Sequence, residues 1–227
     1  MKKFFTVLCV SLICCSVFCS CKDDDDFSTN NTYSVSGSEN GKDYVDLGLS
    51  VKWAAYNVGA TKPEGYGDFY AWGETSTKSQ YEWTTYNYYR ASDDKITKYC
   101  DSDNLVSLEP EDDVAHVKWG GKWRMPKKTE IQELIDNCTW TWTRQNNVNG
   151  YRVTGHNGNS IFIPAAGSRG NEDYHFDEGE EGGFWSSTRT SYHSFYAYVP
   201  YFSYEDYDFI DGYMRCMGLP VRPVFSE

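Results

Sequence analysis

Short runs rich in aromatic residues recur along the chain, and they constrain its fold more than any other feature. DFYAWGE at 68–74 and YEWTTYNYY at 81–89 are two of them. Phe, Trp and Tyr make up 17% of the 227 residues, which is far more than disordered chains carry. Because aromatic side chains favour the half-buried surface of a strand, this composition predicts a strand-rich globular body. The length is enough for the core of one domain and requires no second domain.

The acidic balance of the chain limits its partners. The formal charge is −12 at neutral pH, and no basic run occurs in the sequence. Binding to nucleic acid depends on Lys and Arg side chains that displace counterions from phosphates. We therefore expect no nucleic-acid partner.

Residues 1–20 have the pattern of a lipoprotein signal peptide. Two lysines precede an apolar run over 4–18, which is shorter than the roughly 20 residues that a membrane-spanning helix needs. FCSC at 18–21 resembles a bacterial lipobox, in which a cysteine is diacylated on sulfur and becomes the mature N-terminus. This resemblance implies lipidation of Cys21 and a membrane anchor. The alternative is a plain secretory signal, with Cys21 as an ordinary thiol.

An acidic run and a polar segment follow that cysteine. The run consists of Lys22, Asp23, Asp24, Asp25 and Asp26. Beyond it, the chain as far as Lys42 is rich in Ser, Thr, Asn and Gly, with too little apolar surface to fold. We expect 21–42 to be a lipidated, acidic start and a flexible tether, and 43–227 to be the folded domain.

One helix is predicted near 128–138. Four apolar side chains have the i, i+3, i+4, i+7 spacing of one helical face: Ile131, Leu134, Ile135 and Cys138. Thr129 and Gln132 would form a capping box at its start.

Short strands are predicted around this helix. The segment 44–60 has two β-rich runs around Leu47-Gly48-Leu49, which is typical of an opening hairpin. A second hairpin is expected over 151–165, with its turn at His156-Asn157-Gly158. Further strands are expected in 194–216, and a final one in 218–225. One helix among many short antiparallel strands with long loops indicates an α+β domain.

Several separated motifs occur in order within 44–225: YVDLGLSVKWAAYNVGA, YGDFYAWGE, LEPEDDVAHVKWGGKWRMP, CTWTWT, NGYRVTGHNGNSIFIPAAGSR, GGFWSSTR and VRPV. They resemble the Fibrobacter succinogenes major paralogous domain (FISUMP), which is abundant in lipoproteins of Bacteroidetes. More distantly, WRMPKKTEIQELI at 123–135 and the last strand resemble formylglycine-generating-enzyme-like domains. That resemblance implies a C-type-lectin-like fold. Where its pattern has threonine after proline this chain has Lys127, which would move the helix cap to Thr129.

In the same bacterial group, an acidic run after the lipidated cysteine resembles an export signal of surface lipoproteins. For 22–26 this implies that the anchor lies in the outer membrane and that the domain faces the cell exterior. The alternative is a solvated charge run at the start of a linker.

Three cysteines remain after Cys21: Cys100, Cys138 and Cys216. In an oxidising compartment they allow at most one disulfide among themselves, and the pair that would form it stays open. Their wide spacing argues against a zinc site. They also do not reproduce the paired, copper-binding cysteines of formylglycine-generating enzymes, so that chemistry is not expected.

No catalytic residue is predicted. The four histidines lie in no nucleophile motif, and GSRG at 167–170 lacks the G-x-S-x-G elbow. Paired carboxylates of a glycoside hydrolase stay open as an alternative, because 33 acidic residues allow many pairs.

One segment concentrates hard metal ligands: Glu109, Glu111, Asp112, Asp113 and His116. Calcium takes about six to eight oxygens and usually a glycine turn, which this segment lacks. The i, i+4 spacing of Asp112 and His116 favours a capping role instead. EDYDFIDG at 205–212 resembles a calcium loop only superficially, and its alternation predicts a half-buried strand. No cofactor is predicted, and calcium alone stays open.

A C-type-lectin-like fold raises the question of sugar binding. The calcium-dependent sugar motif of that fold has Glu-Pro-Asn, and Glu109-Pro110-Glu111 has the wrong third residue. Aromatic rings stack on sugar faces, and four candidates are Trp185, Tyr192, Tyr196 and Tyr201. The alternative is that these rings fill the core or pair across strands.

Together these features predict a surface-exposed outer-membrane lipoprotein. Its domain is expected to be a non-catalytic binding or adhesion module for a glycan or protein ligand. The two alternatives are a glycan-processing hydrolase that uses carboxylates and a structural component of a surface assembly.

Overall fold

The structure is a computed structural model that describes residues 35–171, 175–207 and 209–226. These residues belong to one compact unit, Thr32–Glu227. Cys21 and the acidic run 22–26 lie outside the described residues, so their roles stay predictions. The described part has fourteen short strands and two α-helices, and its sheets are small and antiparallel. The predicted α+β class is therefore confirmed. No helix within the described ranges is long and apolar enough to cross a membrane.

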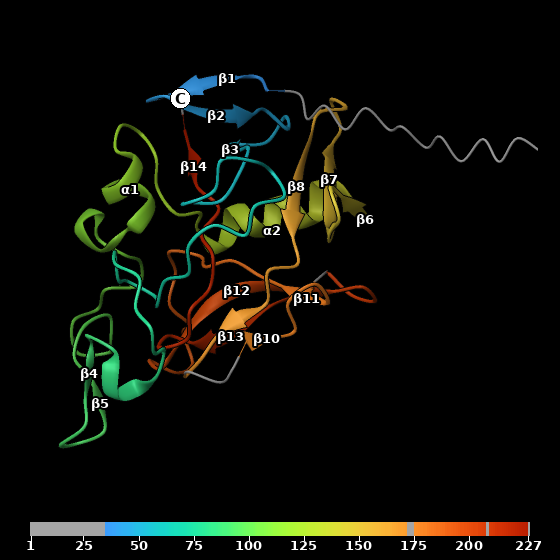
Figure 1. Cartoon of the computed structure of the whole chain (residues 1–227). Helices are drawn as coiled ribbons and strands as arrows, with labels where there is room; N and C mark the ends of the chain where they lie inside the picture. The colour runs from blue at the N-terminus through green and yellow to red at the C-terminus, as the bar shows by residue number, and fades with distance from the viewer. Residues whose placement is uncertain (1–34, 172–174, 208, 227) are drawn as a thin grey trace, which may run out of the picture. The chain divides into compact units, whose positions relative to one another are not determined.

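The first sheet joins the two ends of the described chain (Figure 1). Its antiparallel order is β1-β2-β3-β14. The strands are β1 (Gly37–Glu39), β2 (Lys42–Val45), β3 (Lys52–Ala54) and β14 (Val224–Phe225). Val45 pairs with Trp53, so the predicted hairpin around Leu47-Gly48-Leu49 is confirmed.

The folded unit begins earlier than the expected boundary at residue 43. β1 lies within the segment assigned to the tether, and it pairs with β2. The turn between them is Asn40-Gly41, with φ values of 46° and 74°. Asn-Gly is the strongest short signal for a tight hairpin turn, because both residues tolerate positive φ. The low apolar content of 27–42 predicted a tether, although Asn40-Gly41 within it is a hairpin signal.

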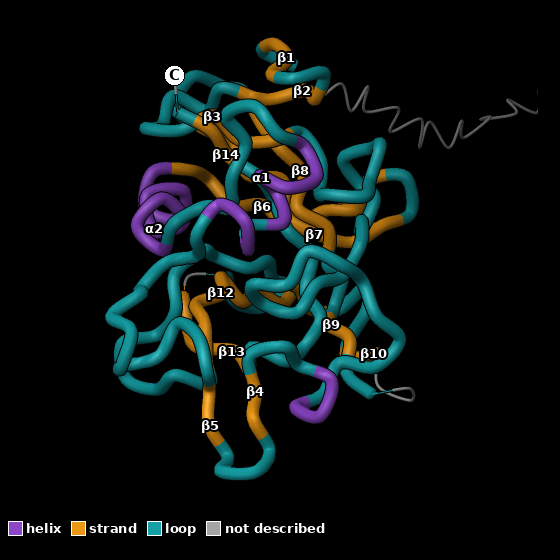
Figure 2. The backbone as a smooth tube through the Cα atoms, turned by 90° about the vertical axis from the view of Figure 1, so that its left-hand side faces the viewer, coloured by secondary structure: helices purple, strands orange, loops and turns teal. Residues whose placement is uncertain are grey.

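A helix and a three-stranded meander follow in the chain. They are α2 (Lys128–Asn137), β6 (Cys138–Gln145), β7 (Val148–Gly155) and β8 (Ser160–Pro164). Ile131, Leu134 and Ile135 are buried in the core, as their spacing predicts. The second predicted hairpin, β7 with β8, is also confirmed. Figures 1 and 2 both place α2 between the β1-β2-β3-β14 sheet and β12.

The predicted cap of this helix at Thr129 is wrong. Lys127 is the N-cap residue, with extended backbone directly after Pro126. Its backbone N–H donates to a Glu130 carboxylate oxygen at 2.8 Å. Arg124 holds the same carboxylate at 2.6 Å. The helix therefore begins at once after Lys127, and Thr129 lies inside its first turn.

The remaining strands form one three-stranded sheet and two small hairpins. The sheet has the order β11-β12-β13, and its strands are β11 (Glu181–Gly182), β12 (Tyr196–Ser203) and β13 (Phe209–Met214). The hairpins are β9 (Ser168–Arg169) with β10 (His175–Phe176), and β4 (Tyr89–Arg90) with β5 (Lys95–Ile96). The strand predicted within 205–212 is confirmed only for the second half of that segment, because β13 begins at Phe209.

Helical turns fill part of the segment between β3 and α2. These are η1 (Trp83–Thr85), η2 (Pro110–Asp112) and the short helix α1 (Val114–Trp119), which the sequence did not predict. Val114 and Ala115 are buried in the same cluster as Trp72 and Trp185. Aromatic residues thus supply much of the core, because Trp53, Trp72, Trp123 and Trp185 are fully buried.

The three cysteines of the described unit are free thiols, so the disulfide that their number allowed is not formed. Burial raises the pKa of Cys216 to about 12 and that of Cys138 to about 11. A thiol with so high a pKa is largely unreactive at neutral pH, since the thiolate is the nucleophile.

Candidate functional site

The candidate site lies on one face of the β11-β12-β13 sheet. Hydrogen-bonded partners in antiparallel strands project to the same face, and alternate residues of one strand share a face. Val199 pairs with Asp211, and Ala197 pairs with Tyr213. Glu181 pairs with Ser203 of β12. Ser203 is on the same face of β12 as Tyr201 and Val199, because these are alternate residues of the strand. The register therefore brings Glu181, Tyr201 and Asp211 to one side of the sheet, although they are far apart in sequence.

A cavity of about 290 Å³ opens on this face. The residues that line it are Gly167, Ser168, Asp177, Glu181, Gly182, Val199, Tyr201, Asp211, Gly212, Tyr213 and Leu219. The β9–β10 hairpin supplies Ser168, and Figure 1 draws β10 beside β13. Ser168 Oγ and Tyr213 Oη are hydrogen-bonded at 3.0 Å. The cavity thus has apolar and aromatic walls, with carboxylates from three segments.

Two of these carboxylates belong to one turn, in which the Glu181 N–H donates to the Asp177 carbonyl oxygen at 2.9 Å. Burial, and then the charge of Asp177, raise the pKa of Glu181. Asp211 Oδ1 accepts a hydrogen bond from the Tyr192 hydroxyl at 2.9 Å. In the described ranges, no Lys or Arg forms an ion pair with any of the three carboxylates.

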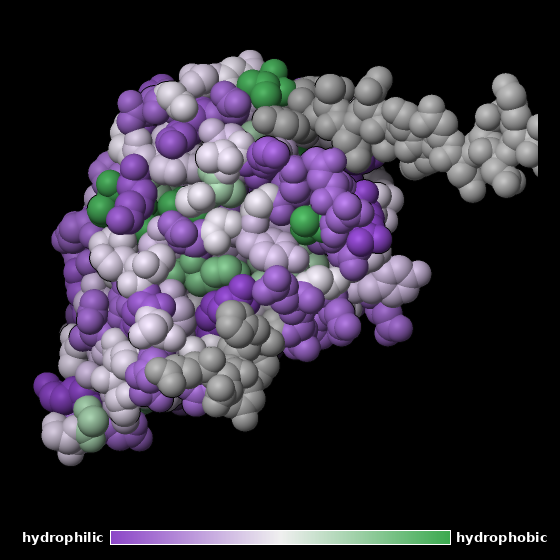
Figure 3. Space-filling view, viewed as in Figure 1, coloured by the Kyte–Doolittle hydropathy of each residue, from purple (hydrophilic) through white to green (hydrophobic). Residues whose placement is uncertain are grey.

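A second hollow, of about 490 Å³, shares Glu181 with the cavity. Its lining residues are Trp142, Asn149, Gly179, Glu180, Glu181, Ser203, Tyr204 and Glu205. Tyr204 is 68% exposed, and its ring lies 5.9 Å from that of Trp142, edge to face. We call the cavity and this hollow together the acidic groove. On the face drawn in Figure 3, hydrophobic residues are mostly scattered among hydrophilic ones.

Removing one charge from the carboxyl pair should stabilise the protein at neutral pH. The folded-state pKa of Glu181 is raised, so ionisation of the pair costs stability as the pH rises through that pKa. We expect Glu181→Gln to raise Tm by about 1–3 °C at pH 7, which corresponds to less than about 1 kcal/mol. Below the ordinary glutamate pKa the gain should disappear. Thermal unfolding at pH 7 and pH 4 measures both.

The exposed Glu111→Gln substitution removes the same charge and is the control. It should leave Tm unchanged at both pH values. A loss of stability for Glu181→Gln at pH 7 would contradict the repulsion argument.

The four predicted stacking residues have different surroundings. Trp185 is fully buried, and its Nε1 donates to the Tyr70 carbonyl at 2.7 Å, so its prediction as a ligand-stacking ring is wrong. It packs in the core, which was the alternative. Tyr201 lines the cavity. Tyr192 is 61% exposed and reaches the groove through Asp211. Tyr196 is half-buried in β12 and lines neither part of the groove.

The predicted metal ligands do not converge. Glu109 and Asp112 both pair with Lys98, at 2.7 and 2.6 Å. Asp113 caps α1 by accepting from the backbone N–H of His116 at 3.1 Å, and it also accepts from Met125 N–H at 2.8 Å. Glu111 is exposed. A group of three His, Cys, Asp or Glu side chains that could hold a metal ion is not found in the described parts of the chain. The capping role predicted for Asp112 is wrong, because Asp113 caps the helix and Asp112 accepts hydrogen bonds from Lys98 and from the Tyr99 hydroxyl.

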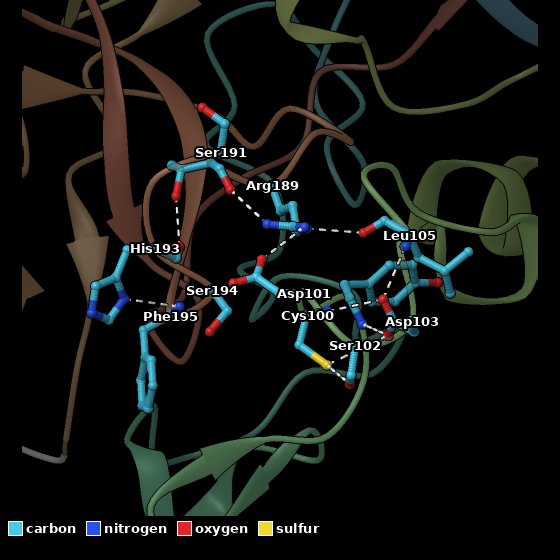
Figure 4. A network of polar contacts seen from close by, with 12 residues as sticks. Cys100, Asp101, Ser102, Asp103, Leu105, Arg189, Ser191, His193, Ser194 and Phe195 are labelled. Atoms are coloured by element: carbon cyan, nitrogen blue, oxygen red, sulfur yellow. Dashed lines mark hydrogen bonds and ion pairs between the residues drawn. The ribbon is translucent and has the colours of Figure 1, made fainter.

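A second polar network surrounds Asp103 and Arg189 (Figure 4). Asp103 accepts backbone N–H bonds from Tyr99 at 2.6 Å and Leu105 at 2.9 Å. Arg189 is largely buried, donates to the Leu105 carbonyl at 3.0 Å and pairs with Asp101 at 3.1 Å. The polar groups of this network thus hold loops together, and none of these contacts forms a nucleophile–base pair.

The acidic groove was missed at the level of sequence because acidic residues are abundant. Asp177 and Glu181 stand in no motif and belong to one local turn, whereas Asp211 comes to the same side of the sheet only through the cross-strand register. No family model, curated protein or solved structure matches the chain. The resemblances to FISUMP and to C-type-lectin-like domains therefore depend on the sequence motifs alone.

Proposed function

We propose that this chain is a FISUMP-type lipoprotein of the outer membrane whose C-type-lectin-like domain is a non-catalytic binding or adhesion module. Cys21 carries the lipid, 22–26 direct the anchor to the surface, and the domain binds a glycan or protein ligand. The acidic groove is the observation that supports binding most directly. It combines aromatic walls with carboxylate acceptors, which is the usual composition of a ligand site: mostly apolar, with a few polar groups that orient the ligand.

A glycan array tests the binding function, with the compact unit Thr32–Glu227 as the probe. It is run once with calcium and once with chelator, to separate calcium-dependent from calcium-independent recognition. Tyr204→Ala removes the most exposed ring of the groove, and we expect it to abolish any signal. Val117→Ala removes a 48% exposed side chain from α1 and is the matched control. A silent array together with turnover of a model glycoside would favour the hydrolase instead.

The anchor is tested separately in the source organism. Cys21→Ala removes the acylated sulfur, so we expect the chain to leave the outer-membrane fraction almost completely. One acyl chain gives only marginal binding and two give stable anchoring, which is why this loss should be large. Cys100→Ala is the control. Unchanged membrane retention of Cys21→Ala would exclude the lipid anchor at this residue.

A further inference from the structure

We propose that the cavity of the acidic groove binds a cationic side chain of a protein partner, an ammonium or guanidinium group on an apolar stem. This inference depends on the proposed binding function, and it selects a protein ligand over a neutral glycan. Two features support it: the carboxylates of the cavity complement a positive charge, and the apolar walls can contact the stem of the side chain.

The described side chains that line the cavity carry charge of one sign. Asp177, Glu181 and Asp211 line it, and none of the described lining side chains is Lys, Arg or His. Glu180 and Glu205 add two more carboxylates in the neighbouring hollow, where the described lining residues also include no basic side chain. Elsewhere in the described unit, Lys78 pairs with the buried Glu74 at 2.7 Å, and Lys98 pairs with Asp112 at 2.6 Å. The groove therefore has a negative charge that a bound cation would neutralise.

Three carboxylates in the lining of one cavity favour a cation over a hydroxyl group. Carboxylates in one cavity repel each other when they are ionised, and burial, followed by the charge of Asp177, raises the pKa of Glu181. A sugar hydroxyl donates a hydrogen bond but leaves the excess negative charge in place. An ammonium or guanidinium group donates hydrogen bonds and also offsets the charge.

The walls fit the stem that carries such a group. Val199 and Leu219 provide apolar surface, and Tyr201 and Tyr213 provide rings. Lys and Arg bury their methylene stems along apolar surface while the charged end reaches polar groups. A cation beside a tyrosine ring gains further from the negative face of the ring. The acidic, aromatic hollow that shares Glu181 would contact the residues flanking that side chain.

The test uses the full chain, purified in detergent, and three probes followed by calorimetry. Nα-acetyl-lysine amide carries the cation. Nα-acetyl-norleucine amide keeps the stem without the charge, and a neutral N-acetylglucosamine oligomer represents a glycan. We expect lysine amide to bind about tenfold or more tightly than norleucine amide. Its affinity should fall as salt is raised from 0.05 to about 0.5 M, because salt screens the attraction.

Variants assign the binding to the cavity. Glu181→Gln and Asp211→Asn should each weaken lysine-amide binding by about tenfold, whereas Glu111→Gln, with the same change in charge, should leave it unchanged. Thermal unfolding confirms that each variant is folded.

Two results would overturn the inference. Equal affinity for lysine and norleucine amides would show that charge is not recognised, and equal weakening by Glu111→Gln would show that the attraction is not local. If the glycan oligomer binds and lysine amide does not, the cationic ligand is wrong while the binding function stands. If no probe binds and the array is also silent, the binding function itself fails.

Discussion

Replacing Arg222 with alanine should lower the free energy of unfolding by about 3–5 kcal/mol. Its guanidinium is completely buried and donates to Asn57 Oδ1 at 2.8 Å and to the carbonyl oxygens of Ala54 and Phe162 at 3.1 and 2.9 Å. Phe162 lies in β8 and Ala54 ends β3, so one side chain ties two sheets together. Truncation leaves three buried acceptors unsatisfied and opens a cavity as well.

The absence of a counter-charge does not weaken this expectation. Among the described residues Arg222 has no carboxylate partner, and burial lowers its pKa. Its retention inside the core therefore depends on the neutral acceptors around it. Urea unfolding measures the loss, with the exposed Arg144→Ala in β6 as the control, expected within about 0.5 kcal/mol of the parent.

Arg222→Met separates the two causes. It refills much of the volume but satisfies none of the three acceptors. We expect Arg222→Met to recover only the cavity contribution, about 1–2 kcal/mol of the loss. A methionine variant as stable as the parent would show that the buried charge costs as much as its hydrogen bonds contribute.

Replacing Arg215 with alanine should cost a similar amount, about 3–4 kcal/mol, through a different set of contacts. The guanidinium lies 4.3 Å from the ring centre of Trp72, as in a cation–π pair. It donates to Tyr86 Oη at 2.9 Å and to the carbonyl oxygens of Lys98, Tyr99 and Ser194 at 3.0, 3.1 and 2.9 Å. Loops from three parts of the chain converge on this one group.

The effect of Arg215→Ala should extend to local structure. Tyr99 has a positive φ of 59°, which costs energy for a residue other than glycine and persists only where its surroundings hold it. Without Arg215 we expect faster amide exchange over 95–105 than the global loss of stability explains. Hydrogen exchange measured by mass spectrometry, together with urea unfolding, checks both effects.

Arg215→Lys is the matched variant. Lysine keeps the charge beside Trp72 but lacks the planar fork that reaches several carbonyls at once. We expect it to recover less than half of the stability lost in Arg215→Ala. Full recovery by lysine would mean that the cation–π contact, and not the hydrogen bonds, is decisive.

Local patterns in the sequence were sufficient for much of the fold. The spacing of Ile131, Leu134 and Ile135 predicted α2, and Gly-rich or Asn-rich turns predicted the hairpins β2–β3 and β7–β8. These elements depend on residues a few positions apart, so short-range periodicity and turn chemistry determine them. Asn40-Gly41 is also a local signal for the β1–β2 turn, although the polar composition around it is typical of a tether.

Only the tertiary structure decided the candidate site. Glu181, Tyr201 and Asp211 become neighbours through the register of three strands, and register depends on the packing of the whole sheet. From the sequence, Trp185 and Tyr201 are equal candidates for stacking on a ligand, because both are aromatic. In the structure Trp185 is buried in the core, whereas Tyr201 lines the cavity. The sequence by itself determined that a helix lies near 128–138 and that two hairpins have their turns near Gly48 and Asn157, because neighbouring residues set backbone conformation. It did not determine which side chains meet, because burial and charge contacts arise between segments that only folding brings together.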